Sequence, residues 1–408
     1  MKAFNPNPED LADEFNELVG DFNTLTCSYM FTCRTLVGVN ATRRGLKASG
    51  CKATNPIDKC WRCDANWANN RKKLADCVRG FGHDTTGGKK GRYYLVTDPS
   101  DDIMDNPKPG TLRHAVIQTE PLWIIFAHSF VIKLRQELIM TSDKTIDGRG
   151  VQVHIAYGAG LTLQFIHNVI IHNIWIHDLV KSPGGMIRDA INHIGLRMQS
   201  DGDAIDIYGS TNIWIDHVSM SRGVDGLIDV LEGSTAITIS NCKFNHHNKV
   251  MLLGAHDQDS QDVDMHITVA YNKFGKGCIQ RMPRVRWGFA HVVNNDYSHW
   301  ELYAIGGSAH PTIISQGNRF KASSTTNQYI KEVTHRDYAT PEEWKKWQWR
   351  SEGDLFKNGA FFVESGQPFI PENSPLIGNN MLRYMPASTV GKLTRNAGAL
   401  KCRAGSLC

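Results

Sequence analysis

Two closely spaced pairs of aspartates are the residues in this sequence best suited to hold a metal ion. Asp201 and Asp203 flank a glycine, and the segment Asp225-Gly-Leu-Ile-Asp229 follows about one repeat later. Carboxylates that converge from neighbouring turns of chain can bind a hard cation such as calcium, which accepts irregular sets of oxygen ligands. Aspartate is also common in Asp-Gly turns, where it binds nothing. Because two such pairs lie close together, the sequence favours a calcium site.

Basic residues follow the aspartates along the chain. Lys249 precedes a short apolar run, and Arg281, Arg284 and Arg286 surround Pro283. Guanidinium groups bind carboxylates through paired hydrogen bonds. Basic side chains beside an acidic metal site therefore indicate an acidic polymer that the metal bridges to the protein. The alternative is that these arginines are ordinary solvated surface residues.

Charge and composition exclude several other classes of protein. The 408 residues include 45 Lys and Arg and 41 Asp and Glu, and the resulting formal charge of +4 is scattered along the chain. Nucleic-acid binding usually needs a denser basic stripe, so no nucleic-acid partner is expected. No apolar run approaches the roughly 18 residues of a spanning helix, so no membrane association is expected. The chain also lacks the Gly-x-Ser-x-Gly and Gly-Lys-Ser/Thr segments of common hydrolases and nucleotide-binding proteins.

Short runs of β-branched residues recur from residue 145 onward, and each ends in polar residues. The residues that end the six clearest runs are 44, 24, 31, 23 and 23 positions apart: Asn173, His217, Asn241, Asn272, Asn295 and Asn318. This spacing favours the coils of a parallel β-helix, in which stacked asparagines can form a ladder of amide hydrogen bonds. Leucine-rich repeats would need a Leu-x-x-Leu-x-Leu frame, and a β-sandwich would need more hairpin turns. The interval of 44 predicts a loop that leaves the coil just before Asp201.

Eight of the ten cysteines lie near the two ends of the chain, which indicates disulfides formed in an oxidising compartment. Cys60–Cys77 and Cys402–Cys408 are the favoured pairs, although spacing alone leaves the connectivity open. Cys60-Trp-Arg-Cys63 has the spacing of a zinc site but lacks a second Cys or His pair nearby. Asn40 begins the single Asn-x-Ser/Thr glycosylation sequence of the chain, in agreement with the same compartment.

The N-terminal part is predicted to differ from the rest of the chain. Residues 1–54 form a cysteine-containing extension, in which apolar residues between Leu11 and Phe22 recur with helical spacing. Residues 1–19 lack the basic and apolar regions of a signal peptide. Residues 55–408 are predicted to form the main domain, which starts with a cap. In this cap the residues from Trp67 to Val78 are predicted to form an amphipathic helix, which the Cys60–Cys77 disulfide links to the strand that precedes it. The amphipathic N-terminal region and the disulfide-closed C-terminus are expected to cover the open ends of the coil.

Five long motifs follow one another along residues 55–365. They are Asn55-Pro-Ile-Asp-Lys-Cys-Trp-Arg-Cys63, Pro107-Lys-Pro-Gly-Thr-Leu-Arg-His-Ala115, Thr145-Ile-Asp-Gly-Arg-Gly150, Ile213-Trp-Ile-Asp-His217 and Gln280-Arg-Met-Pro-Arg284. Together they resemble the plant pectate lyases of polysaccharide lyase family 1. The segment Leu179-Val-Lys-Ser-Pro-Gly-Gly-Met186 is similar to the subgroup that contains the pollen allergens of ragweed, mugwort and cypress. Within the fourth motif, Asp216 and His217 are interpreted as structural supports of the coil.

This resemblance implies a right-handed parallel β-helix that cleaves de-esterified homogalacturonan by β-elimination, with Ca2+ as cofactor and unsaturated oligogalacturonides as products. It implies a calcium site formed by four aspartates: Asp201, Asp203, Asp225 and Asp229. It also implies that Lys249 and Arg286 bind the substrate and that Arg281 is the catalytic base. The family further implies a secreted cell-wall protein whose partner is the pectin polysaccharide, and a monomer is expected.

The implied chemistry sets conditions on the site. β-Elimination removes the proton on C5 of a galacturonate, and that proton is acidic enough only when calcium and Lys249 neutralise the adjacent carboxylate. A guanidinium is protonated at neutral pH, so Arg281 can act as a base only where neighbouring cations favour its neutral form, which predicts an alkaline optimum. Two rival functions remain: a pectin-binding wall protein without turnover, and a polygalacturonase that hydrolyses with paired carboxylates. The latter would need a Gly-His-Gly segment, which this sequence lacks.

Overall fold

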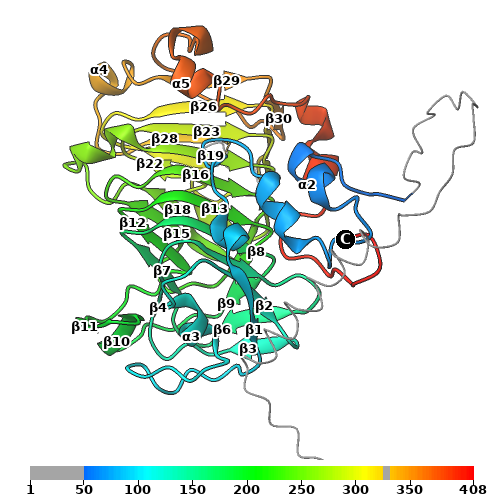
Figure 1. Cartoon of the computed structure of the whole chain (residues 1–408). Helices are drawn as coiled ribbons and strands as arrows, with labels where there is room; N and C mark the ends of the chain where they lie inside the picture. Colours follow the sequence, from blue (N-terminus) through cyan, green and yellow to red (C-terminus); the bar gives the residue numbers. More distant parts are fainter. Residues whose placement is uncertain (1–49, 325–330) are drawn as a thin grey trace, which may run out of the picture.

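Three parallel β-sheets wind around one long core in this computed structural model, which describes residues 50–324 and 331–408. Each turn of the chain adds a strand to a sheet, and the new strand pairs in parallel with the strand of the previous turn (Figure 1). The architecture is a parallel β-helix, as the repeats predicted.

The first sheet contains all six strands that the sequence pattern predicted. Its ten strands lie in the order β1 (Arg92–Val96), β2 (Leu122–Phe126), β5 (Lys144–Asp147), β8 (His167–His172), β13 (Thr211–Asp216), β16 (Thr235–Ser240), β19 (His266–Ala270), β23 (Phe289–Val293), β26 (Thr312–Gln316) and β29 (Trp349–Glu352). The predicted runs correspond to β8, β13, β16, β19, β23 and β26. Strands rich in Ile and Val fit this position because the sheet is buried on both faces.

The second sheet holds the candidate functional residues. Its nine strands lie in the order β28 (Thr334–Arg336), β25 (Ile305–Gly307), β22 (Arg284–Val285), β18 (His247–Leu253), β15 (Gly226–Leu231), β12 (Ile205–Tyr208), β7 (Leu161–Gln164) and β4 (Leu138–Ile139), with β21 (Cys278–Gln280) paired to β18 off the main path. An antiparallel hairpin, β10 (Gly185–Ala190) and β11 (His193–Arg197), projects from the coil between β9 and β12 (Figure 1). This hairpin is the predicted loop that leaves the coil before Asp201.

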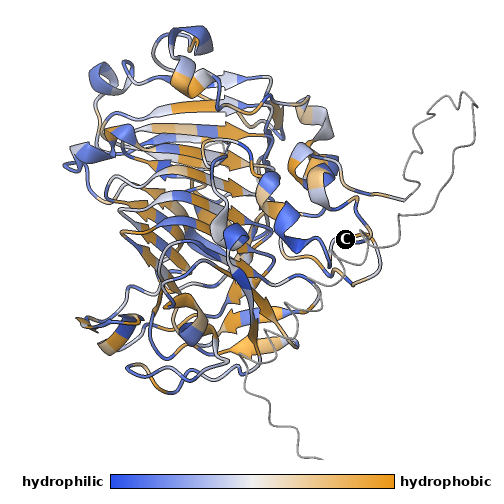
Figure 2. Ribbon diagram, viewed as in Figure 1, coloured by the Kyte–Doolittle hydropathy of each residue, from blue (hydrophilic) through white to orange (hydrophobic). Residues whose placement is uncertain are grey.

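The third sheet completes each coil. Its strands are β3 (Phe130–Ile132), β6 (Val153–Ala156), β9 (Trp175–His177), β14 (Ser219–Ser221), β17 (Lys243–Asn245), β20 (Lys273–Phe274), β24 (Asp296–Ser298), β27 (Arg319–Lys321) and β30 (Leu355–Lys357). Five buried or partly buried rings stack along it: Phe244, Phe274, Tyr297, Phe320 and Phe356. The centroids of neighbouring rings are 4.6–5.6 Å apart, close to the strand spacing of about 4.8 Å. Aromatic side chains of successive coils therefore stack directly on one another. Figure 2 shows the resulting apolar strands and more polar loops.

Helices are few and short. The α-helices are α2 (Pro56–Trp61), α3 (Leu112–Val116), α4 (Pro341–Trp344), α5 (Pro375–Gly378) and α6 (Val390–Leu393), and the 3-10 helices are η1 (Arg71–Asp76), η2 (Gly87–Lys90), η3 (Ser260–Asp264), η5 (Pro371–Asn373) and η6 (Ala387–Thr389). α3 contacts β1, β2 and β4 and so packs against the first coils. In the described part of the chain, no helix has the length and apolar character needed to cross a bilayer.

The predicted asparagine ladder is only half right. Asn272, Asn295 and Asn318 are fully buried, and Nδ2 of each of the first two donates to Oδ1 of the next at 3.0 Å. The other three residues, Asn173, His217 and Asn241, occupy a neighbouring column and have positive φ. Ser240 lies opposite Ala270, so the residue that aligns with Asn241 is Tyr271. A shift of one position moves a side chain to another face of the coil, and spacing in the sequence does not reveal such a shift.

Disulfides link Cys60 to Cys77 and Cys402 to Cys408, as predicted, and a third links Cys51 to Cys63. Cys60 and Cys63 therefore belong to different disulfides, which excludes zinc binding by this pair. Cys60 lies in α2, so the strand predicted there is wrong.

The predicted amphipathic helix from Trp67 to Val78 is reduced to the short η1. Asn66 explains part of this difference, because its backbone and side-chain oxygens accept hydrogen bonds from Asn69 and Asn70. Such local bonds favour turns over a regular helix.

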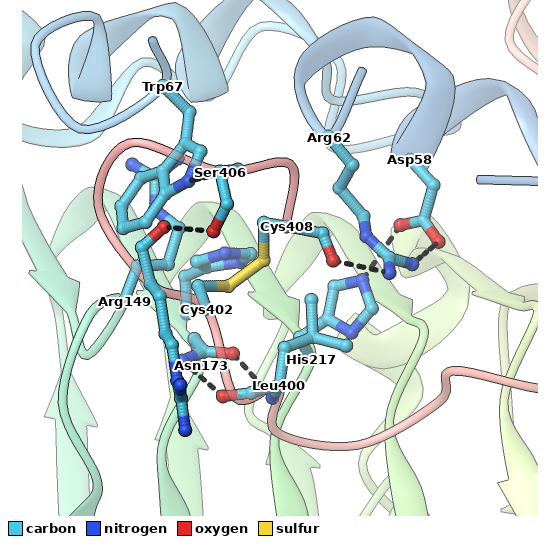
Figure 3. Close-up of a disulfide and its surroundings, with 12 residues drawn as sticks. Asp58, Arg62, Trp67, Arg149, Asn173, His217, Leu400, Cys402, Ser406 and Cys408 are labelled. Atoms are coloured by element: carbon cyan, nitrogen blue, oxygen red, sulfur yellow. Dashed lines mark hydrogen bonds and ion pairs between the residues drawn. A yellow bond between two sulfur atoms is a disulfide. The ribbon is translucent and has the colours of Figure 1, made fainter. Parts of the chain in front are cut away.

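The two ends of the described chain meet over the outer face of the first sheet (Figure 3). The disulfide-closed C-terminus therefore lies beside the coil and not over one of its open ends as predicted. Nε1 of Trp67 donates to the carbonyl oxygen of Ser406 at 3.0 Å, and Nη2 of Arg62 donates to that of Cys408 at 2.9 Å. We call this arrangement the clasp. The predicted helix between residues 11 and 22, and Asn40, lie outside the described residues.

A buried ion pair joins the clasp to the first sheet. Nε2 of His217 lies 2.8 Å from Oδ1 of Asp58, and both side chains are buried. Burial lowers the pKa of His217, but the charges of Asp58 and Asp216 outweigh it, so this pKa lies above its ordinary value. Burial likewise opposes ionisation of Asp58, but His217 and Arg62 hold its pKa below the ordinary value. This geometry agrees with the interpretation of His217 as a structural support.

Replacing Asp58 with Asn is therefore expected to destabilise the protein by about 3 kcal/mol at pH 6. The His217 contribution is complete below its unfolded pKa of about 6.5 and is lost as the pH rises through the higher folded value, whereas the Asp58 contribution is lost only in acid. The deficit of the variant should therefore shrink at pH 9, as measured by urea unfolding. Asp84→Asn, which affects an exposed His83–Asp84 pair, is the control. An equal deficit of Asp58→Asn at both pH values would contradict this prediction.

Candidate active site

The structure brings the four predicted metal ligands to two neighbouring strands of the second sheet. Asp201 and Asp203 precede β12, Asp225 directly precedes β15, and Asp229 lies within β15. The two strands are paired, and Oδ1 of Asp203 accepts a hydrogen bond from the backbone N–H of Gly226 at the start of β15. The acidic side chains of consecutive coils therefore lie against one another.

Gly226 leaves the space that these carboxylates occupy. A Cβ at this position would lie 2.6 Å from Oδ1 of Asp229 and 2.8 Å from Oδ1 of Asp203. Both distances are below van der Waals contact, so only glycine lets carboxylate oxygens from two coils share this space.

Crowding and burial make the ionised state of these carboxylates unfavourable. Burial, together with the charges of Asp225 and Asp201, raises the pKa of Asp203 to about 6, although the Gly226 N–H opposes the shift. Burial and the charges of neighbouring aspartates raise the pKa of Asp229 well above its usual range. A proton or a bound cation would therefore stabilise the carboxyl groups of Asp203 and Asp229.

The chemistry of this donor set fits a hard divalent cation, which prefers oxygen ligands. Oδ1 of Asp206, which lies opposite Asp229 and is not in the predicted set, is buried and has no hydrogen-bond partner. Across residues 50–324 and 331–408, no three Asp, Glu, His or Cys side chains already have the geometry of a metal cage. Lys249 pairs with Asp225, and the Gly226 N–H binds Asp203. Asp225 would have to leave Lys249 to bind a cation.

The predicted basic residues follow on the next coils of the same sheet. Lys249 of β18 lies opposite Gly226, and Gln280 of β21 lies opposite Lys249. Arg281 directly follows β21, and Arg286 directly follows β22. The predicted acidic and basic residues therefore lie on one sheet of the coil, and they follow one another along its axis in the order of the sequence.

Arg281 lies between the acidic and the basic residues of the site. Its Nε is buried and has no hydrogen-bond partner. Its charge favours the ionised form of Asp229, and it lowers the pKa of Tyr303, although burial outweighs this and raises that pKa to about 12. Arg281 has a φ of 60°, a backbone conformation that is uncommon outside glycine and is often retained at functional sites.

Arg286 and Arg284 have different environments. Nε of Arg286 donates to Oδ1 of Asp257 at 3.0 Å, and its Nη1 donates to the carbonyl oxygen of Gly254 at 2.6 Å. These two bonds fix the orientation of the Arg286 guanidinium. Arg284 is buried and pairs with Asp337 at 3.2 Å, which is a structural role.

Sequence reasoning missed Asp206, Glu137 and Asp257. Asp206 could have been found, because it alternates with the buried residues Ile205 and Ile207 and so must face outward from β12. Glu137, whose charge helps to raise the pKa of Asp206, and Asp257, which holds Arg286, belong to no motif. Only the register between distant coils brings them to the site.

Comparison with known proteins gives a consistent family. Residues 129–401 match the family profile described as pectate lyase. The chain is 55% identical over 433 residues to a protein of Arabidopsis thaliana named probable pectate lyase 7, covering 100% of this chain and 90% of that protein. It is 56% identical over 410 residues to a pectate lyase of Lilium longiflorum, with the same coverage of both chains.

Solved structures agree with this result. Jun a 1, the major allergen from cedar pollen, is 46% identical and superposes with a TM-score of 0.81 over 85% of this chain and 100% of the allergen. A thermostable pectate lyase, 18% identical, has the same fold with a TM-score of 0.56 over 81% of this chain and 97% of that chain. The resemblance found in the sequence motifs is confirmed, and the chain belongs to the pectate lyase family of enzymes.

Proposed function

We propose that the protein cleaves de-esterified homogalacturonan by calcium-dependent β-elimination. The order of charges along the second sheet carries the proposal: acidic side chains at β12 and β15 are followed by basic side chains at β18, β21 and β22. An acidic polymer on this face would meet a cation held by the aspartates and then a row of cationic side chains. Membership of the pectate lyase family supports the same reaction.

In this proposal the four aspartates hold calcium: Asp201, Asp203, Asp225 and Asp229. Bound calcium would neutralise the carboxylate next to C5 of a galacturonate, which makes the C5 proton more acidic. Lys249 would exchange its present partner, Asp225, for that substrate carboxylate. Arg286, already oriented by Asp257 and Gly254, would bind a second carboxylate of the polymer.

Arg281 would take the proton from C5 in its neutral form and become a guanidinium. The electron pair of the broken C5–H bond forms the C4–C5 double bond, and the bond from C4 to the glycosidic oxygen breaks. The departing oxygen takes a proton from solvent. Arg281 suits this role because it follows β21 directly, beside Lys249 and near Asp229, and because its Nε has no partner in the protein.

Removal of calcium is expected to lower the rate on polygalacturonate by roughly a hundredfold or more, because the carboxylate beside C5 then keeps its charge. The measurement is the ultraviolet absorbance of the unsaturated product at alkaline pH, before and after a chelator. Added calcium should restore the rate, and magnesium should restore little, because it demands a stricter geometry. Saturated products, or a rate that the chelator leaves unchanged, would refute the proposed reaction.

We further infer that residues 55–408 form the catalytic domain, that residues 1–54 are an extension, and that the protein acts as a secreted monomer on cell-wall pectin. Three disulfides among the described residues support an extracellular setting, because such bonds persist in oxidising compartments. The relatives named pectate lyase come from plants, whose cell walls contain pectin, in agreement with this inference.

A further inference from the structure

A cavity of about 320 Å³ adjoins the candidate calcium ligands, on the side of the earlier coils. β7, β12 and the hairpin β10–β11 supply its walls. The side chains that decide its chemistry are Glu137, Leu196, Arg197, Met198 and Asp206, next to Asp201 and Asp203. A polymer that extends from the calcium ligands toward β7 would enter this cavity.

The hairpin wall is held in place at its base. The backbone N–H of Ser182 donates to Oγ of Ser200 at 2.8 Å, and the N–H of Ser200 donates to the carbonyl oxygen of Ser182 at 3.1 Å. Nη1 of Arg197 donates to Oε1 of Gln164 on β7 at 2.8 Å. The hairpin is therefore an anchored wall, and the side chains at the end of β11 have fixed positions beside the cavity.

The charges of the cavity oppose a free galacturonate. Four carboxylates line it, against the single guanidinium of Arg197: Glu137, Asp201, Asp203 and Asp206. Arg197 already bonds to Gln164, and its Nε lies 3.9 Å from Oε2 of Glu137. Calcium held by the aspartate pairs would offset charge at Asp201 and Asp203. Glu137, and Asp206 when it is ionised at the alkaline pH of the assay, would still face a substrate carboxylate at close range.

Apolar side chains occupy the rim of the same cavity. Leu196 is 73% exposed and Met198 is 81% exposed, which is unusual for large apolar residues beside an acidic site. Exposed apolar side chains at the edge of a pocket gain free energy when a ligand methyl group covers them. Asp206 lines the cavity, and its carboxyl group can accept a hydrogen bond from a sugar hydroxyl.

We propose that this cavity binds a galacturonate residue whose carboxyl carries a methyl ester, while the free galacturonate beside it is held at the calcium site. An ester has no charge for Glu137 and Asp206 to repel, and its methyl group can contact Leu196 and Met198. This inference rests on the proposed function, and it makes the hairpin a determinant of specificity for partly methyl-esterified pectin over polygalacturonate.

The test compares kcat/KM on polygalacturonate and on the same polymer after partial methyl esterification. The wild-type protein should prefer the esterified polymer, and mass spectrometry should find an ester at a fixed position relative to the cleaved bond. The double replacement Leu196→Ser and Met198→Ser should lower the preference for the esterified polymer about threefold to tenfold. This effect is smaller than that of losing a methyl contact in a closed pocket, because the cavity is open to solvent at this rim. Both residues are exposed, so these replacements leave the fold intact.

Asp206→Asn should have the opposite effect, because it removes a charge and keeps an oxygen acceptor of the same shape. The ratio of rates should then shift toward polygalacturonate by roughly threefold. Ile191→Ser is the matched control, since Ile191 is an exposed apolar residue at the tip of the same hairpin and does not line the cavity. The preference of this control should equal that of the wild type.

Two outcomes would overturn the inference: esters scattered at random around the cleaved bond, or a preference that neither variant changes. A wild-type preference for polygalacturonate that Asp206→Asn weakens would also overturn it and would indicate a second bound cation. If no polymer is cleaved, the proposed reaction fails, and retardation in native gels that contain either polymer still decides whether the cavity selects the ester.

Discussion

Replacing Arg281 with Lys is expected to lower kcat for elimination by about a thousandfold or more while KM and polymer binding change little. The proposed proton acceptor is lost, since a lysine side chain carries a single ammonium on a flexible stem in place of the planar guanidinium beside Asp229 and Tyr303. General-base groups contribute roughly a hundredfold to ten-thousandfold to a rate. The positive charge remains, so attraction of the acidic polymer should persist. Initial rates from the ultraviolet absorbance of the product, together with retardation in gels that contain polygalacturonate, separate the two effects.

Arg135→Lys is the control for this replacement, because Arg135 is an exposed arginine paired with Asp102 outside the site. It should keep the wild-type kcat. If Arg281→Lys lost binding and turnover equally, Arg281 would be a substrate-binding residue, and the assignment of the base would be wrong.

Replacing Gly226 with Ala is expected to weaken calcium binding by about tenfold to a hundredfold, the range found when groups that orient metal ligands are changed. The added methyl carbon would lie 2.6 Å from Oδ1 of Asp229 and 2.8 Å from Oδ1 of Asp203, so at least one carboxylate must turn away. The φ of Gly226 lies outside the left-handed region that favours glycine, so alanine strains no backbone there. Calorimetric titration with calcium measures the loss directly, and excess calcium should recover part of the lyase activity.

Gly195→Ala provides a matched control, because a Cβ at Gly195 would lie 3.3 Å from the His193 ring and 3.9 Å from Oδ2 of Asp189, and it would touch no candidate metal ligand. Its calcium affinity should equal that of the wild type. Unchanged calcium affinity in Gly226→Ala would show that Asp203 and Asp229 do not bind the metal together.

Much of the fold could be predicted from the sequence, because each coil repeats the same physical requirements. Six runs of Ile, Val and Thr fall in consecutive strands of one sheet, where both faces are buried and branched side chains stack on one another. The register between coils could not be predicted. Asn241 and Asn272 end similar runs, yet they lie in different columns, because the alignment depends on how each loop returns to the coil.

The candidate site could likewise be predicted only in part. The residue types of Asp203, Asp229, Lys249 and Arg281 indicate their chemistry, and the structure brings them to one face. Their contacts could not be derived, since Lys249 reaches Asp225 across one coil and Glu137 reaches the cavity through the packing of β4 and β7. Sequence spacing also left the partner of Cys63 open, and the structure shows it to be Cys51.

The clasp has a consequence for biosynthesis. Trp123, Trp214 and Tyr271 point outward from the first sheet and are buried because the segments around α2 and Cys402 cover them. Arg62 and Cys408 are 346 positions apart, so the ribosome must add that length of chain before their hydrogen bond can form. Until then the nascent coil presents a row of large apolar side chains to solvent, which is the kind of surface that chaperones recognise and that promotes aggregation. Closure of the clasp is therefore a late step of folding, and chains that stop before Leu393 should depend on chaperones to stay dispersed.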